Sequence, residues 1–258
     1  MLGLGNSITV GAALSEILPH VDISDCVLAF YADIESSTIT VPTALQYWLD
    51  QADVAANSVA ASAGGTAGGP AGLRPGVTGS GVDRAVIFDG GSDRLDIISN
   101  NAGYETTLDT SDGGWTVVII AMSDDWDGGQ QAFIGDTGSN NHFIRHASGA
   151  NQFRVKVDAE SNEIDLDTPS SLTDGQYYCI QVDCTADGNT ITMYIDGVAQ
   201  SDTESLANNT KNLVIETIGH RNSTDLVDGG IKSILAFDRI LTSDERALIN
   251  TWAAPYIG

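Results

Sequence analysis

Basic residues are scarce in this sequence. Only 11 Lys and Arg stand against 35 Asp and Glu, which gives a formal net charge of −24 at pH 7. A surface of this sign repels phosphate backbones and anionic lipid surfaces, so we expect binding to neither nucleic acid nor membranes. The acidity fits a saline habitat, the binding of divalent cations, or simply a well-solvated surface.

Cysteine is also rare, with three residues in the chain. Cys179 and Cys184 fall on one predicted strand with odd spacing, so their side chains point to opposite faces and cannot form a bridge. Cys26 could pair with either in principle, but we expect three free thiols that are buried. The spacing also lacks the Cys-x-x-Cys arrangement of a zinc site.

Long apolar runs are missing as well. The longest, residues 117–122, is far shorter than the roughly 20 residues that a membrane helix needs. The first basic residue is Arg74, so the opening of the chain lacks the positive region of a secretory signal. If the protein works outside a cell, we expect it to be released by lysis or as part of a particle.

Short apolar or alternating segments, separated by turn residues, dominate the rest of the chain. Residues 115–122 and 230–237 are apolar on both faces, which predicts strands that are covered on both sides. Residues 85–97 and 177–195 predict hairpins, whereas residues 57–81, rich in Gly, Ala and Ser, predict a long surface loop. Further strands are predicted at residues 26–31, 47–50, 131–135, 142–145, 152–157 and 212–219. Together these segments predict an all-β sandwich.

A short helix is predicted near the C-terminus. Thr242 and Glu245 have the spacing of a capping box, which begins a helix. Leu248 and Trp252, four residues apart, are then expected to face the core. Pro255 is expected to end the helix.

Four segments of the sequence resemble the laminin-G-like members of the concanavalin A-like lectin/glucanase family. They are VLAFYADIESSTITVPTALQYWLDQ, DRAVIFDGGSDRLDI, MYIDGVAQ and GGIKSILAFDRILTSDERALINTW, in the order that the family shows. The resemblance implies an all-β, two-sheet antiparallel jelly-roll sandwich over residues 23–258, with a short C-terminal helix.

Residues 1–22 resemble the short leaders that open many virion proteins of tailed bacteriophages, particularly of marine and cyanobacterial phages. The resemblance implies an extended N-terminal arm that anchors the sandwich to other virion proteins, above all the capsid. The residues assigned to anchoring are Leu2, Leu4, Asn6 and Ile8. For a protein of this kind we expect a symmetric homo-oligomer, a trimer or a dimer, located in the virion.

An acidic loop with one aromatic residue is the strongest candidate for ligand binding. Carboxylate oxygens suit calcium, and a tryptophan ring suits stacking on a sugar. Asp136 and Asn140, on a neighbouring turn, could complete a calcium site with Asp124 and Asp127. The residues assigned to ligand binding are Asp124, Asp125, Trp126 and Asp127.

Glu163, Asp165 and Asp167 alternate along a predicted strand and therefore share one face. The segment resembles the E-[ILV]-D-x-E strand of retaining glycosidases with the same sandwich, in which the first Glu is the nucleophile and the last the acid/base. Carboxylates about 5 Å apart would suit that mechanism. Asp167, however, is one methylene shorter than the Glu that the resemblance requires, and we favour a solvated acidic face.

Two functions remain open. The favoured one is a non-enzymatic structural protein of a phage virion, of capsid-decoration, fibre or knob type, whose lectin-like sandwich binds glycans. The alternative is a lectin or a degenerate glycoside hydrolase of a marine microbe. The leader, the missing signal and the acidity favour the first, whereas the enzymatic alternative depends on one imperfect pentapeptide.

Overall fold

The computed structural model describes the chain from residue 19 to residue 257 with several gaps. The described ranges are 19–33, 38–41, 44–49, 59–62, 73–99, 106–110, 113–137, 142–147, 152–157, 164–167, 172–187, 190–205, 212–221 and 223–257. The predicted anchoring residues Leu2, Leu4, Asn6 and Ile8 lie outside these ranges. The last four residues of the predicted extended arm form a short helix, α1 (Pro19–Asp22).

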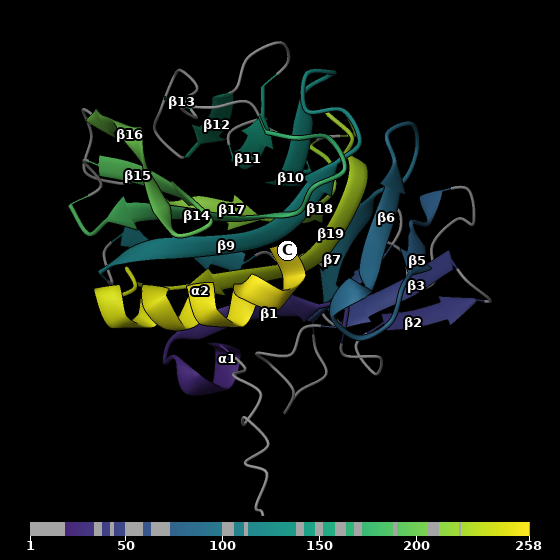
Figure 1. Ribbon diagram of the computed structural model, residues 1–258, viewed down its shortest axis with the longest axis horizontal. Coiled ribbons are helices and arrows are strands. Elements are labelled where there is room, and N and C mark those ends of the chain that lie inside the picture. The colour runs from purple at the N-terminus through teal and green to yellow at the C-terminus, as the bar shows by residue number, and fades with distance from the viewer. Residues whose placement is uncertain are drawn as a thin grey trace, which may run out of the picture.

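The described residues form a β-sandwich with one longer helix at the C-terminus (Figure 1). The predicted all-β class is therefore confirmed. The strands are β1 (Cys26–Tyr31), β2 (Thr38–Val41), β3 (Ala44–Leu49), β4 (Val59–Ser62), β5 (Gly76–Thr78), β6 (Ala85–Asp89), β7 (Leu95–Ser99), β8 (Thr106–Leu108), β9 (Gly114–Ser123), β10 (Gln131–Gly135), β11 (Phe143–His146), β12 (Gln152–Lys156), β13 (Ile164–Asp167), β14 (Tyr178–Thr185), β15 (Thr190–Ile195), β16 (Val198–Ser205), β17 (Leu213–Ile215), β18 (Thr217–Ile218) and β19 (Asp228–Phe237), and the helix is α2 (Ser243–Ile257).

Two antiparallel sheets make up the sandwich. In the first sheet, β19 pairs with β9 on one side and with β1 and β6 on the other, and the sheet continues through β14, β15 and β16. In the second, β7 pairs with β4 and β18, and the sheet runs from β3 through β10, β11 and β12 to β13. The two-sheet antiparallel architecture expected from the sequence is confirmed.

Both faces of the first sheet are covered, which explains why β9 and β19 carry apolar residues on both of their faces. One face packs on the second sheet in a core that contains Trp48, Trp115 and Trp126. The other face packs under α2, as Figure 1 shows. Cys184 lies in the first of these clusters and Cys179 in the second, on opposite faces of β14. The three described cysteines form no disulfide; Cys179 and Cys184 are buried as expected, whereas Cys26 is only partly buried, so the expectation of burial is wrong for Cys26.

The core-facing stripe of α2 differs from the predicted one by one residue. Leu248 is 38 % exposed, whereas Trp252 is 5 % exposed, so the prediction is wrong for Leu248 and right for Trp252. The buried residues have the i, i+3, i+4, i+7 spacing of a single helix face. They are Ile249, Trp252, Ala253 and Tyr256.

Pro255 does not end the helix, contrary to the sequence prediction. It lies inside the last turn, and α2 continues to Ile257. Lys232 of β19 donates from Nζ to the carbonyl oxygen of Tyr256 at 3.0 Å, and the Tyr256 ring packs on Trp252 with centroids 5.3 Å apart. These contacts hold the last turn against the sheet despite the proline.

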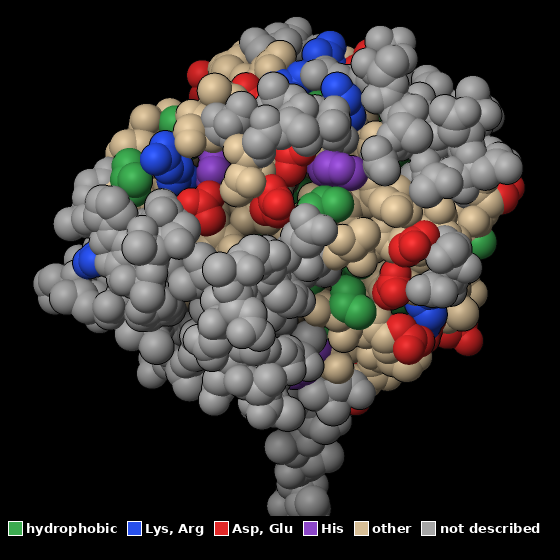
Figure 2. All heavy atoms as spheres, turned by 180° about the vertical axis from the view of Figure 1, so that it is seen from behind, with side chains coloured by type: hydrophobic (Ala, Val, Ile, Leu, Met, Phe, Trp, Pro, Cys, Tyr) green, Lys and Arg blue, Asp and Glu red, His purple; other side chains and the backbone are tan. Residues whose placement is uncertain are grey.

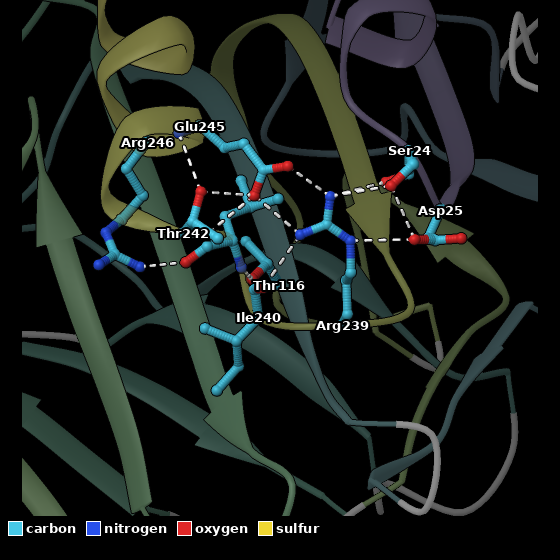
Figure 3. Close-up of polar contacts among 9 residues, drawn as sticks. Ser24, Asp25, Thr116, Arg239, Ile240, Thr242, Glu245 and Arg246 are labelled. Atoms are coloured by element: carbon cyan, nitrogen blue, oxygen red, sulfur yellow. Dashed lines mark hydrogen bonds and ion pairs between the residues drawn. The ribbon is translucent and has the colours of Figure 1, made fainter.

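The start of α2 is tied to the N-terminal end of the sandwich (Figure 3). The predicted capping box is present: Thr242 N donates to Glu245 at 2.8 Å, and Glu245 N donates to the Thr242 hydroxyl at 3.3 Å. Arg239 donates from two nitrogens to the Glu245 carboxylate, at 2.8 and 2.6 Å, and from Nε to Asp25 at 3.0 Å. This one guanidinium therefore joins the turn after α1 to the first turn of α2.

Two sequence predictions about the middle of the chain are wrong. Residues 57–81 are not loop throughout, because β4 pairs with β3 and β7, and β5 pairs with β6. Residues 85–97 are not a hairpin, since β6 pairs within the first sheet and β7 within the second. The turn after β6 instead crosses the rim between the sheets.

Among the described helices, none has the length and apolar character needed to span a membrane.

Candidate functional site

A groove of about 440 Å³ opens where three loops meet at the rim of the sandwich. The lining residues come from residues 89–91 at the end of β6, residues 125–131 in the β9–β10 loop and at the start of β10, and residues 225–228 that lead into β19. The lining is acidic, amide-bearing and rich in glycine, with no aromatic side chain among the described residues. It comprises Asp89, Gly90, Gly91, Asp125, Gly128, Gly129, Gln130, Gln131, Asp225, Leu226 and Asp228.

Asp89 is held in the ionised form on one wall. Its Oδ1 accepts the backbone N–H groups of Gly91, Ser92 and Asp93 at 2.7 to 2.9 Å. Burial raises the pKa of this carboxyl, but the hydrogen bonds from Ser92, Asp93 and Gly91 outweigh it and lower the pKa to about 2. The groove therefore carries one fixed negative charge at any ordinary pH.

Asp228 is the cross-strand partner of Asp89, and its side chain lies against Gly90. A Cβ on Gly90 would lie 2.8 Å from the Cβ of Asp228, and Gly90 has φ +66°. Both the lack of space and the backbone conformation therefore favour glycine at this position. Burial raises the pKa of Asp228, and Asp124, Asp89 and Asp125 raise it further. The carboxyl group of Asp228 thus lies among like charges.

Asp125 closes over a second glycine. A Cβ on Gly128 would come within 2.8 Å of the Asp125 carboxylate. The backbone N–H of Asp125 donates to the Ser123 hydroxyl at 3.0 Å, which ties the loop back to the end of β9. Glycine at position 128 thus lets the Asp125 carboxylate lie against the backbone, whereas no atom lies within 4 Å of a Cβ built on Gly129.

The remaining wall is neutralised by arginine. Asp225 pairs with Arg145 at 2.6 Å and with Arg221 at 3.1 Å. Arg145 also donates to the amide oxygen of Gln130, which leaves the NH₂ group of that amide as a donor. Among the described residues, these arginines reach Asp225 rather than Asp89, Asp125 or Asp228.

Of the four residues assigned to ligand binding, Asp125 lines the groove and Trp126 does not. Trp126 is 1 % exposed and packs on Phe133, His146, Phe153 and Tyr178. The prediction of a tryptophan ring that stacks on sugar is therefore wrong, because the only large apolar side chain of the loop is drawn into the core.

The other two assigned residues, Asp124 and Asp127, are exposed next to the groove. The backbone N–H of Asp124 donates to the carbonyl oxygen of Asp228 at 2.9 Å. Asp127 acts at a distance on the pKa of His146.

The described residues hold no group of three or more His, Cys, Asp or Glu side chains that could bind a metal ion. The proposed convergence of Asp124, Asp127 and Asp136 is thus wrong. Asp136 follows the far end of β10, roughly 17 Å along the strand from the loop that precedes it. Asn140 lies outside the described ranges.

The candidate catalytic strand is described only in part. Ile164 and Leu166 are buried, as the alternation predicts, and Asp165 points outward. Asp165 pairs with Arg154 on the neighbouring strand at 2.7 Å. Glu163 and the side chain of Asp167 lie outside the described part of the chain.

Figure 2 shows described acidic side chains at several places on the face seen from behind, and some of them lie close to Lys or Arg side chains. The acidic excess is therefore partly compensated locally on that face.

Sequence reasoning missed Asp89, Asp228 and Gln131. A repeated tripeptide could have found the first two, since Asp-Gly-Gly occurs at residues 89–91, 127–129 and 228–230, all at the groove, and also at 112–114.

The fold and its rim groove define the class as a two-sheet, lectin-like β-sandwich. Residues 89–245, more than half of the chain, match the model of the concanavalin A-like lectin/glucanases superfamily in its laminin-G-like branch. The chain belongs to that family. No curated protein sequence matches it.

Solved structures share the fold at low sequence identity. A Trypanosoma rangeli sialidase in complex with 2,3-difluorosialic acid aligns over 91 % of this chain and 33 % of its own, with a TM-score of 0.55 and 11 % identity. The binding domain of botulinum neurotoxin DC, in complex with rat synaptotagmin II, aligns over 88 % of this chain and 51 % of its own, with a TM-score of 0.55 and 13 % identity. The chain spans about a third of the sialidase and half of the toxin domain.

Proposed function

We propose that this protein is a non-enzymatic, glycan-binding sandwich displayed on the virion of a tailed bacteriophage. The observation that carries the glycan-binding part is the rim groove, which gathers carboxylate and amide side chains together with four glycines. Its volume lies within the range of small-ligand sites and suits one or two sugar rings.

The polarity of the groove supports a hydroxyl-rich ligand. The carboxylates of Asp89, Asp125 and Asp228 are acceptors for sugar hydroxyl groups, and the Gln130 amide adds a donor. Charge-assisted hydrogen bonds of this kind give orientation without an aromatic platform.

The negative charge of the groove indicates which class of sugar it can bind. An anionic sugar would meet the fixed charge of Asp89 and the crowded carboxyl of Asp228. We therefore propose neutral or amine-bearing sugars as ligands. The sialic acid derivative in the similar sialidase structure is a ligand of that protein and would be repelled by this groove.

The virion location is supported by the resemblance of the N-terminal leader and by the acidic composition. In this proposal residues 1–18 contact other virion proteins, above all the capsid, and the sandwich projects outward. The first described element, α1, is held to β1: the backbone N–H of His20 donates to the Tyr31 hydroxyl at 3.3 Å, and the His20 ring Nδ1 lies 3.0 Å from the same oxygen. A symmetric homo-oligomer is part of the proposal.

A glycan array with neutral, amino and sialylated oligosaccharides tests the binding function. We expect signals on neutral or amino sugars, and a loss of at least about tenfold in affinity for Asp125→Asn and Asp228→Asn. Asp244→Asn, an exposed acid on α2, is the matched control and should bind like the wild type. A repeat with EDTA tests whether calcium takes part. Binding confined to sialylated glycans would contradict the proposal.

Mass spectrometry of gradient-purified phage particles that carry this gene tests the location. We expect the protein at many copies per particle, and we expect a variant without residues 1–18 to fold but not to attach. Absence from purified particles would refute the virion role and leave the glycan-binding role standing.

A further inference from the structure

We infer that Gln131 is the positioning residue of the rim groove: its side-chain amide sets the separation between Asp125 and Asp228. The inference rests on the proposed function, because it assigns a role within the same site.

The amide of Gln131 joins the β9–β10 loop, which carries Asp125, to the start of β19, which carries Asp228. Its Nε2 donates to the Ser123 hydroxyl at 2.7 Å and to the carbonyl oxygen of Asp125 at 2.9 Å. Its Oε1 accepts the backbone N–H of Asp228 at 3.1 Å. Both hydrogens and the oxygen of the amide are therefore used, one side on the β9–β10 loop and the other on the start of β19.

Burial makes these contacts structurally demanding. Gln131 is 3 % exposed, so water cannot easily replace any of the three partners. A carboxylate at this position could not donate to the Asp125 carbonyl, and it would add a negative charge between two acidic residues. Only an amide offers donors on one side and an acceptor on the other.

The loop is held from its other side by the aromatic core. Gln131 pairs across the sheet with His146, whose ring lies 5.2 Å from that of Trp126. Trp126 thus anchors the middle of the β9–β10 loop in the aromatic core, while the hydrogen bonds of Gln131 hold the two ends of the loop together. The residues that touch sugar in our proposal, Asp125 and Asp228, depend on this frame for their relative position.

Gln131→Met tests the inference, since methionine keeps the length and apolar volume of the side chain and removes its hydrogen bonds. Gln181→Met is the matched control. Gln181 is also 3 % exposed, and its amide donates to Asp183 at 2.8 Å on a strand that does not line the groove.

Two measurements are made on each variant: amide hydrogen exchange over residues 124–131 and 225–228, and affinity for the neutral oligosaccharide that the wild type binds best. For Gln131→Met we expect exchange about tenfold faster in both segments and affinity about tenfold lower. Gln181→Met should change neither. Unchanged exchange in Gln131→Met, or an equal effect in Gln181→Met, would overturn the inference.

The outcomes separate the two proposals. If the wild type binds no glycan, the proposed function fails, and the exchange data still decide whether Gln131 positions the loops. If Gln131→Met does not fold, Ser123→Ala removes one of the three contacts and should accelerate exchange in residues 124–131 alone.

Discussion

Lowering the pH should reduce the free energy of unfolding of this protein through one buried histidine. His146 is 1 % exposed, its ring meets those of Trp126 and Phe153 edge-on at 5.2 and 5.4 Å, and its Nδ1 has no hydrogen-bond partner among the described residues. Burial lowers its pKa from 6.5 to about 4, and the charge of Asp127 opposes this only in part. The folded protein therefore holds His146 neutral.

The sign and size of the effect follow from proton linkage. Between pH 6.5 and 4 the unfolded chain binds a proton on His146 and the folded chain does not, so the free energy of unfolding falls as the pH falls. Each pKa unit is worth about 1.4 kcal/mol, so the total loss is about 3 kcal/mol, of which about 2 kcal/mol has gone by pH 5. Above pH 6.5 the contribution of His146 is constant.

Urea denaturation of the wild type and of His146→Phe, at pH 7, 6 and 5, measures this effect. Phenylalanine keeps an aromatic ring against Trp126 and Phe153 but cannot take up a proton. Both proteins share the titration of the other groups, so the difference between their free energies of unfolding isolates His146. We expect that difference to shift by about 2 kcal/mol in favour of the variant from pH 7 to pH 5. A difference that stays constant with pH would refute the reasoning.

Two further predictions concern stability. Gly229→Ala should lower the free energy of unfolding by about 3 kcal/mol or more, because Gly229 has φ +147° and a Cβ there would lie 2.2 Å from a backbone oxygen. Gly129→Ala should lower it by less than about 0.5 kcal/mol in the same denaturation assay, because no atom lies within 4 Å of the added Cβ. Glu245→Gln should cost about 1 to 2 kcal/mol by weakening its hydrogen bonds to Arg239 and the helix cap, whereas Asp244→Asn should change stability by less than about 0.5 kcal/mol. Since the Arg239 hydrogen bond leads the effects that lower the pKa of Glu245 from 4.5 to about 2, the wild type should lose this stability as the pH falls from 4.5 to 2, and Glu245→Gln should not. Equal pH profiles would contradict this assignment.

The sequence predicts the strands well where burial alone decides them. Residues 115–122 and 230–237 are largely apolar on both faces because α2 covers one side and the second sheet covers the other. The run of apolar residues in the sequence therefore indicates burial on both sides. It fails for β4, where Val, Ala and Ser give little apolar contrast and pairing with β3 and β7 decides the structure. Long-range backbone pairing of this kind leaves no local signal.

The candidate site is harder to predict than the fold. An acidic loop with a tryptophan at residue 126 has the composition of a sugar platform, but the same residues also suit a loop anchored by a buried ring. Burial of Trp126 among Phe133, Phe153 and Tyr178 selects the second arrangement. The contributions of Asp89 and Asp228 come from parts of the chain far from this loop, and only the fold brings them to it.

The three Asp-Gly-Gly segments at the groove explain how it can be both acidic and open. Carboxylates repel one another and side chains fill space, so a rim that gathers several acids needs backbone that approaches closely without bulk. Gly90 passes against Asp228, and Gly128 lies under Asp125, in each case at a distance that a Cβ would violate. Gly229 packs on the end of β9 in the same way, which fixes where β19 starts. The glycines therefore determine the shape of the groove and the acids its selectivity, so a substitution that adds a methyl group at Gly90 should close the site while leaving its charge unchanged.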